Sequence, residues 1–329
     1  MMMMVMMGCN SGGRDPEKVF LSEMVNLGKG FLDVFVSFGD MITGTLGIKA
    51  DTKKSEIGKY FSDIEETMKT TKVKLNEILN KNGKYEKVKT VVEQFITATL
   101  DKIAEGAKTA ASGTESSDAI GGAPTTGQDA SPADVASVNA LVKGIKGIVG
   151  VVLKKDEGNA GATKTSADEQ KTIGGLFSGN KANDSSEAVA AAASATIGAV
   201  SGADILQAIA NSGEATNASA IDTAKDAANI AAANKEDNKK EINDIAAKKD
   251  AVIAGGIALR GMGKGGKFAA KNEEKAANAV NGAVASAVNK VLSTLTISIR
   301  NTVDEGLKGI SEVLGEIKQG EGSVAKINE

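Results

Sequence analysis

The feature of this sequence that most constrains its fold is a long apolar stripe near the C-terminus. Apolar residues recur at steps of three and four over the 38 residues from 280 to 317. This spacing places them on one face of an α-helix, roughly 57 Å long if it is unbroken. The stripe consists of Val280, Val284, Ala287, Val288, Val291, Leu295, Ile299, Val303, Leu307, Ile310, Leu314 and Ile317. A second copy could cover the stripe in a coiled-coil homodimer, or the N-terminal helix of the same chain could cover it.

Further apolar stripes supply such helices. The same spacing predicts helices over 19–46, 57–79, 85–103 and 135–152. Helices that are joined by short turns usually bury their stripes against one another, which favours packing within one molecule over the homodimer. We therefore predict an all-α fold, an elongated bundle of long helices in which the first and last helices pair.

Composition agrees with the all-α class. No proline occurs in the 197 residues after Pro132, so the strongest helix breaker is absent from the second half of the chain. Aromatic residues make up only 3% of the chain, and the middle is rich in alanine, which has the best intrinsic helix propensity. Weaker patterns there predict helices over 189–209, 218–234 and 238–259.

Three segments without a helical pattern are predicted to be surface loops. Residues 106–131 and 154–186 are dominated by small and polar side chains, and 211–217 forms a shorter interruption. Such segments bury little apolar surface, so we expect them to be loose and tolerant of substitution. The sequence thus predicts one helical domain over 18–329, with these low-complexity loops at one end.

The N-terminus has the features of a lipidation site. Residues 1–7 form a short apolar run, and the small residue Gly8 precedes Cys9, the only cysteine of the chain. We predict that residues 1–8 are the remnant of a signal peptide, that Cys9 carries lipid, and that 9–17 form a flexible tether. No later run approaches the roughly 18 apolar residues of a membrane span, so the lipid would be the anchor. The alternative is an unmodified, exposed cysteine.

Composition also argues against several functions. The chain contains no histidine, which is the commonest general base and metal ligand, and one cysteine cannot form an internal disulfide. Only three arginines occur, and the net charge of −3 gives no basic excess for nucleic acid. We predict no catalytic, metal-binding or cofactor-binding residue. The adjacent carboxylates at 65–66 and 273–274 are expected to be solvated helix faces.

One motif invites a different interpretation. Residues 261–267, GMGKGGK, match the GxxxxGK part of a phosphate-binding loop. Phe268 follows where that loop needs a magnesium-binding Ser or Thr, and the surroundings lack alternating strands and helices. The favoured interpretation is a Gly-rich turn between helices, with Lys264 and Lys267 in solvent and Phe268 in the core.

Several blocks of this sequence resemble the variable large proteins of Borrelia spirochaetes and, more distantly, the VlsE-type lipoproteins. The resemblance covers essentially the whole chain after Cys9. The blocks that carry it are DVFVSFGD at 33–40, the stretch 54–83, IALRGM at 257–262, GGKFA at 265–269 and VLSTLTISIRNT at 291–302.

The resemblance implies a helical lipoprotein on the outer face of the outer membrane, anchored through acylated Cys9. It also implies a role in antigenic variation, with loops directed away from the cell and host antibodies as partners. The segment 249–270 would be largely hidden from those antibodies. An adhesin that binds a host protein through the same loops is the alternative function.

Overall fold

The computed structural model describes residues 47–324 except 82–84, 179–184, 217–219, 237 and 239, together with five isolated helical positions between 22 and 33. Within these described residues the chain is helical, with isolated β-bridges and no strand, so the all-α prediction is confirmed. The helices are α2 (Lys54–Lys81), α3 (Glu86–Phe95), the π-helix η1 (Ile96–Leu100), α4 (Asp101–Ala111), α5 (Val135–Val152), α6 (Ala167–Thr172), α7 (Gly175–Ser178), α8 (Glu187–Ala199), α9 (Gly202–Ala210), the 3₁₀-helix η2 (Ile221–Thr223), α10 (Ala227–Ala231), α11 (Asp250–Met262) and α12 (Glu274–Val324).

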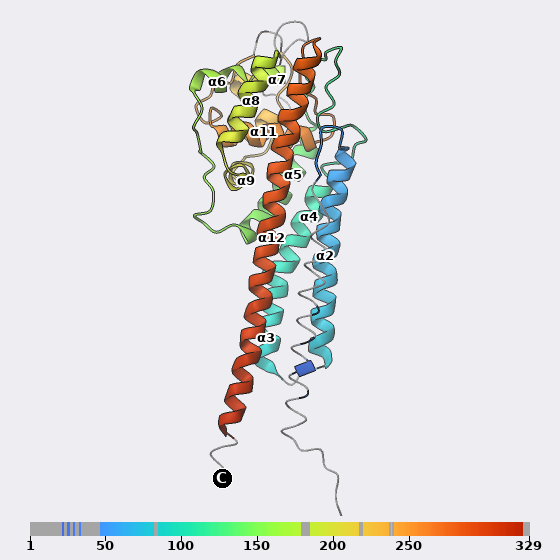
Figure 1. Ribbon diagram of the computed structural model, residues 1–329, viewed down its shortest axis with the longest axis vertical. Helices are drawn as coiled ribbons and strands as arrows, with labels where there is room; N and C mark the ends of the chain where they lie inside the picture. The colour runs from blue at the N-terminus through green and yellow to red at the C-terminus, as the bar shows by residue number, and fades with distance from the viewer. Residues whose placement is uncertain are drawn as a thin grey trace, which may run out of the picture.

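Helix α12 runs along the length of the molecule (Figure 1). It contains the predicted stripe, which is buried as far as Leu314. The covering helices are α8, α9 and α11 at the end where α12 begins, and α3 near its C-terminal end. The prediction that the stripe packs within one molecule is confirmed for these partners. The first helix, predicted over 19–46, falls outside the described residues except at isolated positions, so its pairing with α12 stays a prediction.

Among the described residues, helices α2, α3 and α4 lie beside α12 and form the rod with it (Figure 1). The helix predicted over 85–103 runs without a break through α3, η1 and α4. At its π-helical turn, Phe95 enters a notch that Gly306 leaves in α12. A methyl group added at Gly306 would lie 2.1 Å from the Phe95 ring, so this contact requires glycine.

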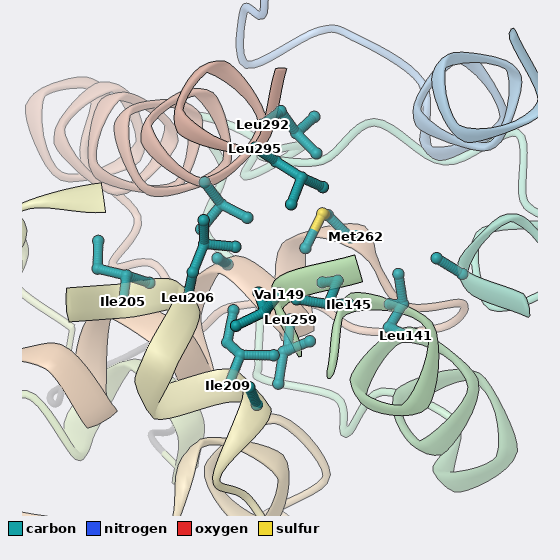
Figure 2. Close-up of a cluster of buried hydrophobic side chains, with 14 of the residues drawn as sticks. Leu141, Ile145, Val149, Ile205, Leu206, Ile209, Leu259, Met262, Leu292 and Leu295 are labelled. Carbon is teal, nitrogen blue, oxygen red and sulfur yellow. The ribbon is translucent and has the colours of Figure 1, made fainter. Parts of the chain in front are cut away.

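The opposite end carries the shorter helices and the loops, and we call residues 112–273 together the loop-bearing end. Its core forms where α5, α9, α11 and α12 meet (Figure 2). The side chains that meet there are aliphatic or methionine: Leu141, Ile145, Val149, Ile205, Leu206, Ile209, Leu259, Met262, Leu292 and Leu295. Close packing of aliphatic side chains therefore builds this part of the core, in a sequence with only 3% aromatic residues.

The loop predicted at 106–131 is partly wrong. Helix α4 continues to Ala111, because Gly106, Ala107 and Ala110 form a small-residue face that lies directly against α5. A Cβ atom at Gly106 would come within 2.8 Å of the Gly144 carbonyl oxygen. Small residues were taken for a loop, whereas here they let two helices approach closely. The loop begins after α4, and even there Ile120 is fully buried.

The loop predicted at 154–186 also contains structure that the sequence analysis missed. Ser166 begins α6 with a capping box, in which its hydroxyl accepts from the Glu169 N–H and the Glu169 carboxylate accepts from the Ser166 N–H. Ile173, Leu176 and Phe177 are fully buried. The expectation that this segment contributes little to the core is therefore wrong, because a short apolar run lies between its polar ends.

The Ala-rich middle is more broken than predicted. The helix expected over 189–209 is two helices, α8 and α9, bent by 97°. Ser201 causes the break, because its side chain forms a capping box with Asp204 and so starts a new helix. Residues 238–249 are not helical where the structure describes them, and the helix expected over 238–259 begins at Asp250.

By length and composition, α5 and a window of α12 could cross a membrane, as could α8 and α9 if they count as one bent span. The expectation that no run approaches that length is therefore wrong. Half of each window of α5 and α12 is buried inside the protein. Valine and alanine give these helices high hydropathy, and the folded chain covers their apolar faces itself.

Candidate functional site

Helix α11 lies at the centre of the loop-bearing end and is enclosed on all sides. Each of its 13 residues is buried. The helices packed around it are α5, α8, α9, α10 and α12. It carries two charged side chains, Asp250 at its first position and Arg260 in its last turn, and both are fully buried. The segment expected to be hidden from antibodies therefore has a buried helix at its core.

Arg260 binds main-chain carbonyl oxygens from several segments. Its Nε donates to the Lys267 oxygen at 3.0 Å. One terminal nitrogen donates to the Ala233 oxygen at 3.2 Å, and the other to the Phe177 oxygen at 3.4 Å. The guanidinium also lies 5.2 Å from the centre of the Phe177 ring and 5.9 Å from that of Phe268. These contacts satisfy a buried charge without a carboxylate partner.

Lys54, the first residue of α2, is the second fully buried cation. Its Nζ donates to the oxygens of Gly263 at 2.6 Å and Gly266 at 2.8 Å, and to that of Arg260 at 3.3 Å. These acceptors belong to the last turn of α11 and the Gly-rich turn after it. Lys54 thus fastens the rod to the loop-bearing end through three carbonyl groups.

These bonds decide how the GxxxxGK motif is interpreted. A phosphate-binding loop points its N–H groups at the ligand. Here three carbonyl oxygens of the motif region converge on the ammonium of Lys54, which is the opposite polarity. Lys264 and Lys267 are exposed and Phe268 is fully buried, so the predicted Gly-rich turn is confirmed. Gly265 supports the turn with φ +75°.

Burial shifts the pKa of both cations. It lowers the pKa of the Lys54 ammonium from 10.5 to about 8, although Asp118 partly opposes this, and the positive charges of Arg260 and Lys267 lower it further. Burial alone lowers the pKa of the Arg260 guanidinium. Both groups are charged at neutral pH, so two desolvated positive charges lie at the last turn of α11 and the Gly-rich turn after it.

The described residues bring together no cluster of three or more carboxylate or thiol groups that could hold a metal ion. The adjacent carboxylates at 65–66 and 273–274 were predicted to be solvated. Of these, Glu65 forms an ion pair with Lys69, one turn further along α2. Cys9, the predicted lipidation site, lies outside the described residues. The residues with structural roles in the site are therefore Lys54, Asp250 and Arg260.

The outer surface of the loop-bearing end consists of polar loops. Exposed runs occur at 124–126, 154–157 and 166–169, which all lie in the segments predicted as surface loops. The exposed side chains face solvent, whereas apolar residues of the same segments point inward to the core around α11. Substitution at the exposed positions should therefore alter the surface and leave the core intact.

The rod of long helices and the loop-covered buried helix define an elongated all-α protein. The family of Borrelia lipoproteins matches residues 31–314, and the chain belongs to this family. It is 58% identical to Variable large protein 4 of Borrelia hermsii, over 99% of this chain and 94% of that protein. Variable large protein 17 is 57% identical, over 99% and 93%.

A solved structure supports the same assignment. The crystal structure of the Lyme disease variable surface antigen VlsE of Borrelia burgdorferi matches with a TM-score of 0.80 at 34% identity. The match covers 91% of this chain and all of that one. The family resemblance inferred from the sequence blocks is therefore confirmed.

Sequence reasoning missed the roles of Lys54 and Asp250. Neither was singled out as a candidate residue, and nothing in their local pattern marks them as buried. Arg260 did carry a signal, because it is the only charged residue in the apolar run from 251 to 263. A single arginine in such a run is typical of a buried cation that needs several acceptors.

Proposed function

We propose that this protein is a lipid-anchored antigen on the outer surface of the outer membrane, used in antigenic variation and without catalytic activity. The observation that carries the proposal is the match along almost the whole chain to a protein described as a variable surface antigen. Acylated Cys9 would hold the chain in the outer leaflet, and the loop-bearing end would face host antibodies. Several acyl chains anchor a protein stably, whereas one does so only marginally.

The distribution of burial supports this role. Antibodies need exposed side chains, and at the loop-bearing end exposed runs lie in the polar loops. Helix α11 is covered on all sides, so an antibody could reach it only after the loops had opened. Changes at exposed loop positions typically alter stability by less than about 0.5 kcal/mol, so the surface can change while the fold stays.

The proposal is tested on intact cells that express the full chain and are labelled with palmitate. We expect label on the wild type, none on Cys9→Ala, and digestion of the wild type by added protease without lysis. A periplasmic protein, which must resist the same protease, controls for lysis. A chain without palmitate that resists protease until the cells are lysed would overturn both the anchor and the surface location.

Antibody access is tested separately with sera against peptides 154–169 and 250–262. Both sera should bind the denatured protein, and only the first should bind intact cells. Binding of the second serum to intact cells, at the level of the first, would show that α11 is not concealed.

A further inference from the structure

We infer that the three predicted loop segments are positioned through their main chain, by polar side chains that core helices supply. The three positioning residues are Asn281 of α12, Asn139 of α5 and Asp250 of α11. Each of them binds two main-chain groups of a different loop. The inference deepens the proposed function and rests on it, because it explains how exposed loop residues could vary without moving the loop.

Asn281 positions the first loop. Its Oδ1 accepts from the N–H of Ala123 at 2.9 Å, and its Nδ2 donates to the oxygen of the same residue at 3.0 Å. The side-chain amide therefore pairs with both main-chain groups of one residue, as a neighbouring β-strand would. Pro124, Thr125 and Thr126 follow directly and are exposed.

Asn139 makes the same pair of bonds to the third loop. The N–H of Ala215 donates to its Oδ1 at 2.8 Å, and its Nδ2 donates to the Ala215 oxygen at 3.3 Å. Glu214 and Thr216, on either side of Ala215, are exposed. Two asparagines on different core helices thus hold two loops in the same way.

Asp250 positions the second loop by accepting bonds. Its Oδ2 accepts from the N–H groups of Lys164 at 2.6 Å and Thr165 at 2.9 Å. Its Oδ1 accepts from the Thr165 hydroxyl and from Gln170, so this contact also uses side chains. The Lys164 side chain is exposed although its N–H is bound. Main-chain binding therefore leaves that side chain free.

The chemistry of these contacts explains their tolerance. Every residue except proline carries both an N–H and a carbonyl group, so a bond to the main chain does not depend on which side chain the loop residue has. At Ala123 and Ala215 the side chain is buried and must stay small. At the exposed neighbours, only the side chains change and the positioning bonds remain.

The test is amide hydrogen exchange, measured residue by residue on the purified full chain. Asn281→Ala should speed exchange at the Ala123 amide, and Asn139→Ala should do so at Ala215. Two lost hydrogen bonds predict roughly 30-fold faster exchange, since one bond typically contributes a factor of about 5. The control Asn278→Ala removes an exposed asparagine of α12 and should change neither amide.

A second variant tests the independence from loop side chains. Thr125→Glu combined with Thr126→Glu alters the exposed loop surface and should leave exchange at Ala123 within about twofold of the wild type. The amide of Ile257 in buried α11 reports global opening. Selective acceleration in the asparagine variants, with no change at Ile257, is the expected result.

Three results would overturn the inference. They are unchanged exchange at Ala123 in Asn281→Ala, equal acceleration at Ile257, or a loop substitution that accelerates Ala123 as much as Asn281→Ala does. Because these measurements use purified protein, their failure is distinct from failure of the surface assay on cells. A chain that proves not to be surface-exposed would leave the exchange results unaffected.

Discussion

Lys54→Met is the most informative single substitution, because it removes one buried charge and the donor that three carbonyl oxygens share. Methionine has nearly the length and volume of lysine without its ammonium, so the change leaves little cavity. The oxygens of Arg260, Gly263 and Gly266 would lose the Lys54 ammonium as a donor at 2.6 to 3.3 Å, and the Gly263 oxygen would keep only the Gly266 N–H at 3.4 Å. Lys54 is fully buried, so water cannot take its place without opening the contact.

Two opposing contributions set the expected magnitude. A buried carbonyl left without a donor costs about 1–3 kcal/mol, and the one bond lost from the Gly263 oxygen about 1 kcal/mol, which together amount to roughly 5 kcal/mol. Removal of the ammonium relieves its desolvation, since a pKa of about 8 instead of 10.5 corresponds to roughly 3 kcal/mol at neutral pH. We therefore expect Lys54→Met to lower the free energy of unfolding by about 2 kcal/mol.

The assay is chemical and thermal unfolding of the purified chain, followed by far-UV circular dichroism. Lys53→Met is the matched control, because Lys53 is adjacent and its side chain is exposed. The control should change the free energy of unfolding by less than about 0.5 kcal/mol. If Lys54→Met is as stable as the wild type, desolvation outweighs the carbonyl bonds and our assignment of Lys54 as a fastening residue is wrong.

The pH dependence provides a second readout of the same group. The pKa of Lys54 is about 8 in the folded chain and near 10.5 when unfolded, so between these values the unfolded state binds more protons. Stability linked to Lys54 should therefore rise as pH increases from 8 to 10.5, by up to about 3 kcal/mol. The wild-type advantage over Lys54→Met should widen over this range. A constant difference would contradict the lowered pKa.

Two further predictions concern single contacts. Gly306→Ala should lower the free energy of unfolding by about 1–3 kcal/mol, because its methyl group would overlap the Phe95 ring. Gly309→Ala, whose methyl group would meet no neighbouring atom, should raise the free energy of unfolding slightly. Urea unfolding of the two variants distinguishes these outcomes. Burial raises the pKa of Asp250, but hydrogen bonds from Thr165 and its neighbours outweigh burial and leave it lowered. The hydrogen bonds to the Asp250 carboxylate should stabilise the folded chain fully at pH values above the ordinary aspartate pKa. This stabilisation should be lost as the pH falls through the lowered pKa of Asp250. The measurement is amide hydrogen exchange at Thr165, which should become faster as the carboxylate is protonated.

The sequence was most informative where apolar residues repeat over many turns. The stripe of α12 was predicted because only a helix places residues at steps of three and four on one face. The regions composed of small residues were harder. Gly106 and Ala110 have the composition of a loop, but they form a face of α4 that lies against α5. Composition alone cannot distinguish these cases, because close packing depends on a partner that is distant in sequence.

The site was less predictable than the fold, for a related reason. The partners of Lys54 lie more than 200 positions away in the chain. The acceptors are carbonyl groups, which every residue possesses, so no sequence motif marks them. The direction of the main-chain groups in the GxxxxGK match could be seen only in the structure. The missing Ser or Thr argued against phosphate binding at the sequence level. The carbonyl oxygens that converge on Lys54 explain it physically, because they would repel a phosphate.

The buried cations follow from the architecture of the loop-bearing end. Its short helices end inside the protein, where the last carbonyl groups of each helix need donors other than water. Lys54 satisfies those after α11, Arg260 those after α10, and Lys290 of α12 donates to the oxygens of Ile197 and Val200 at the end of α8. Positive side chains at helix C-termini also complement the helix dipole. Long cationic side chains from core helices thus hold the ends of the short helices, which frees the exposed loop side chains from that task.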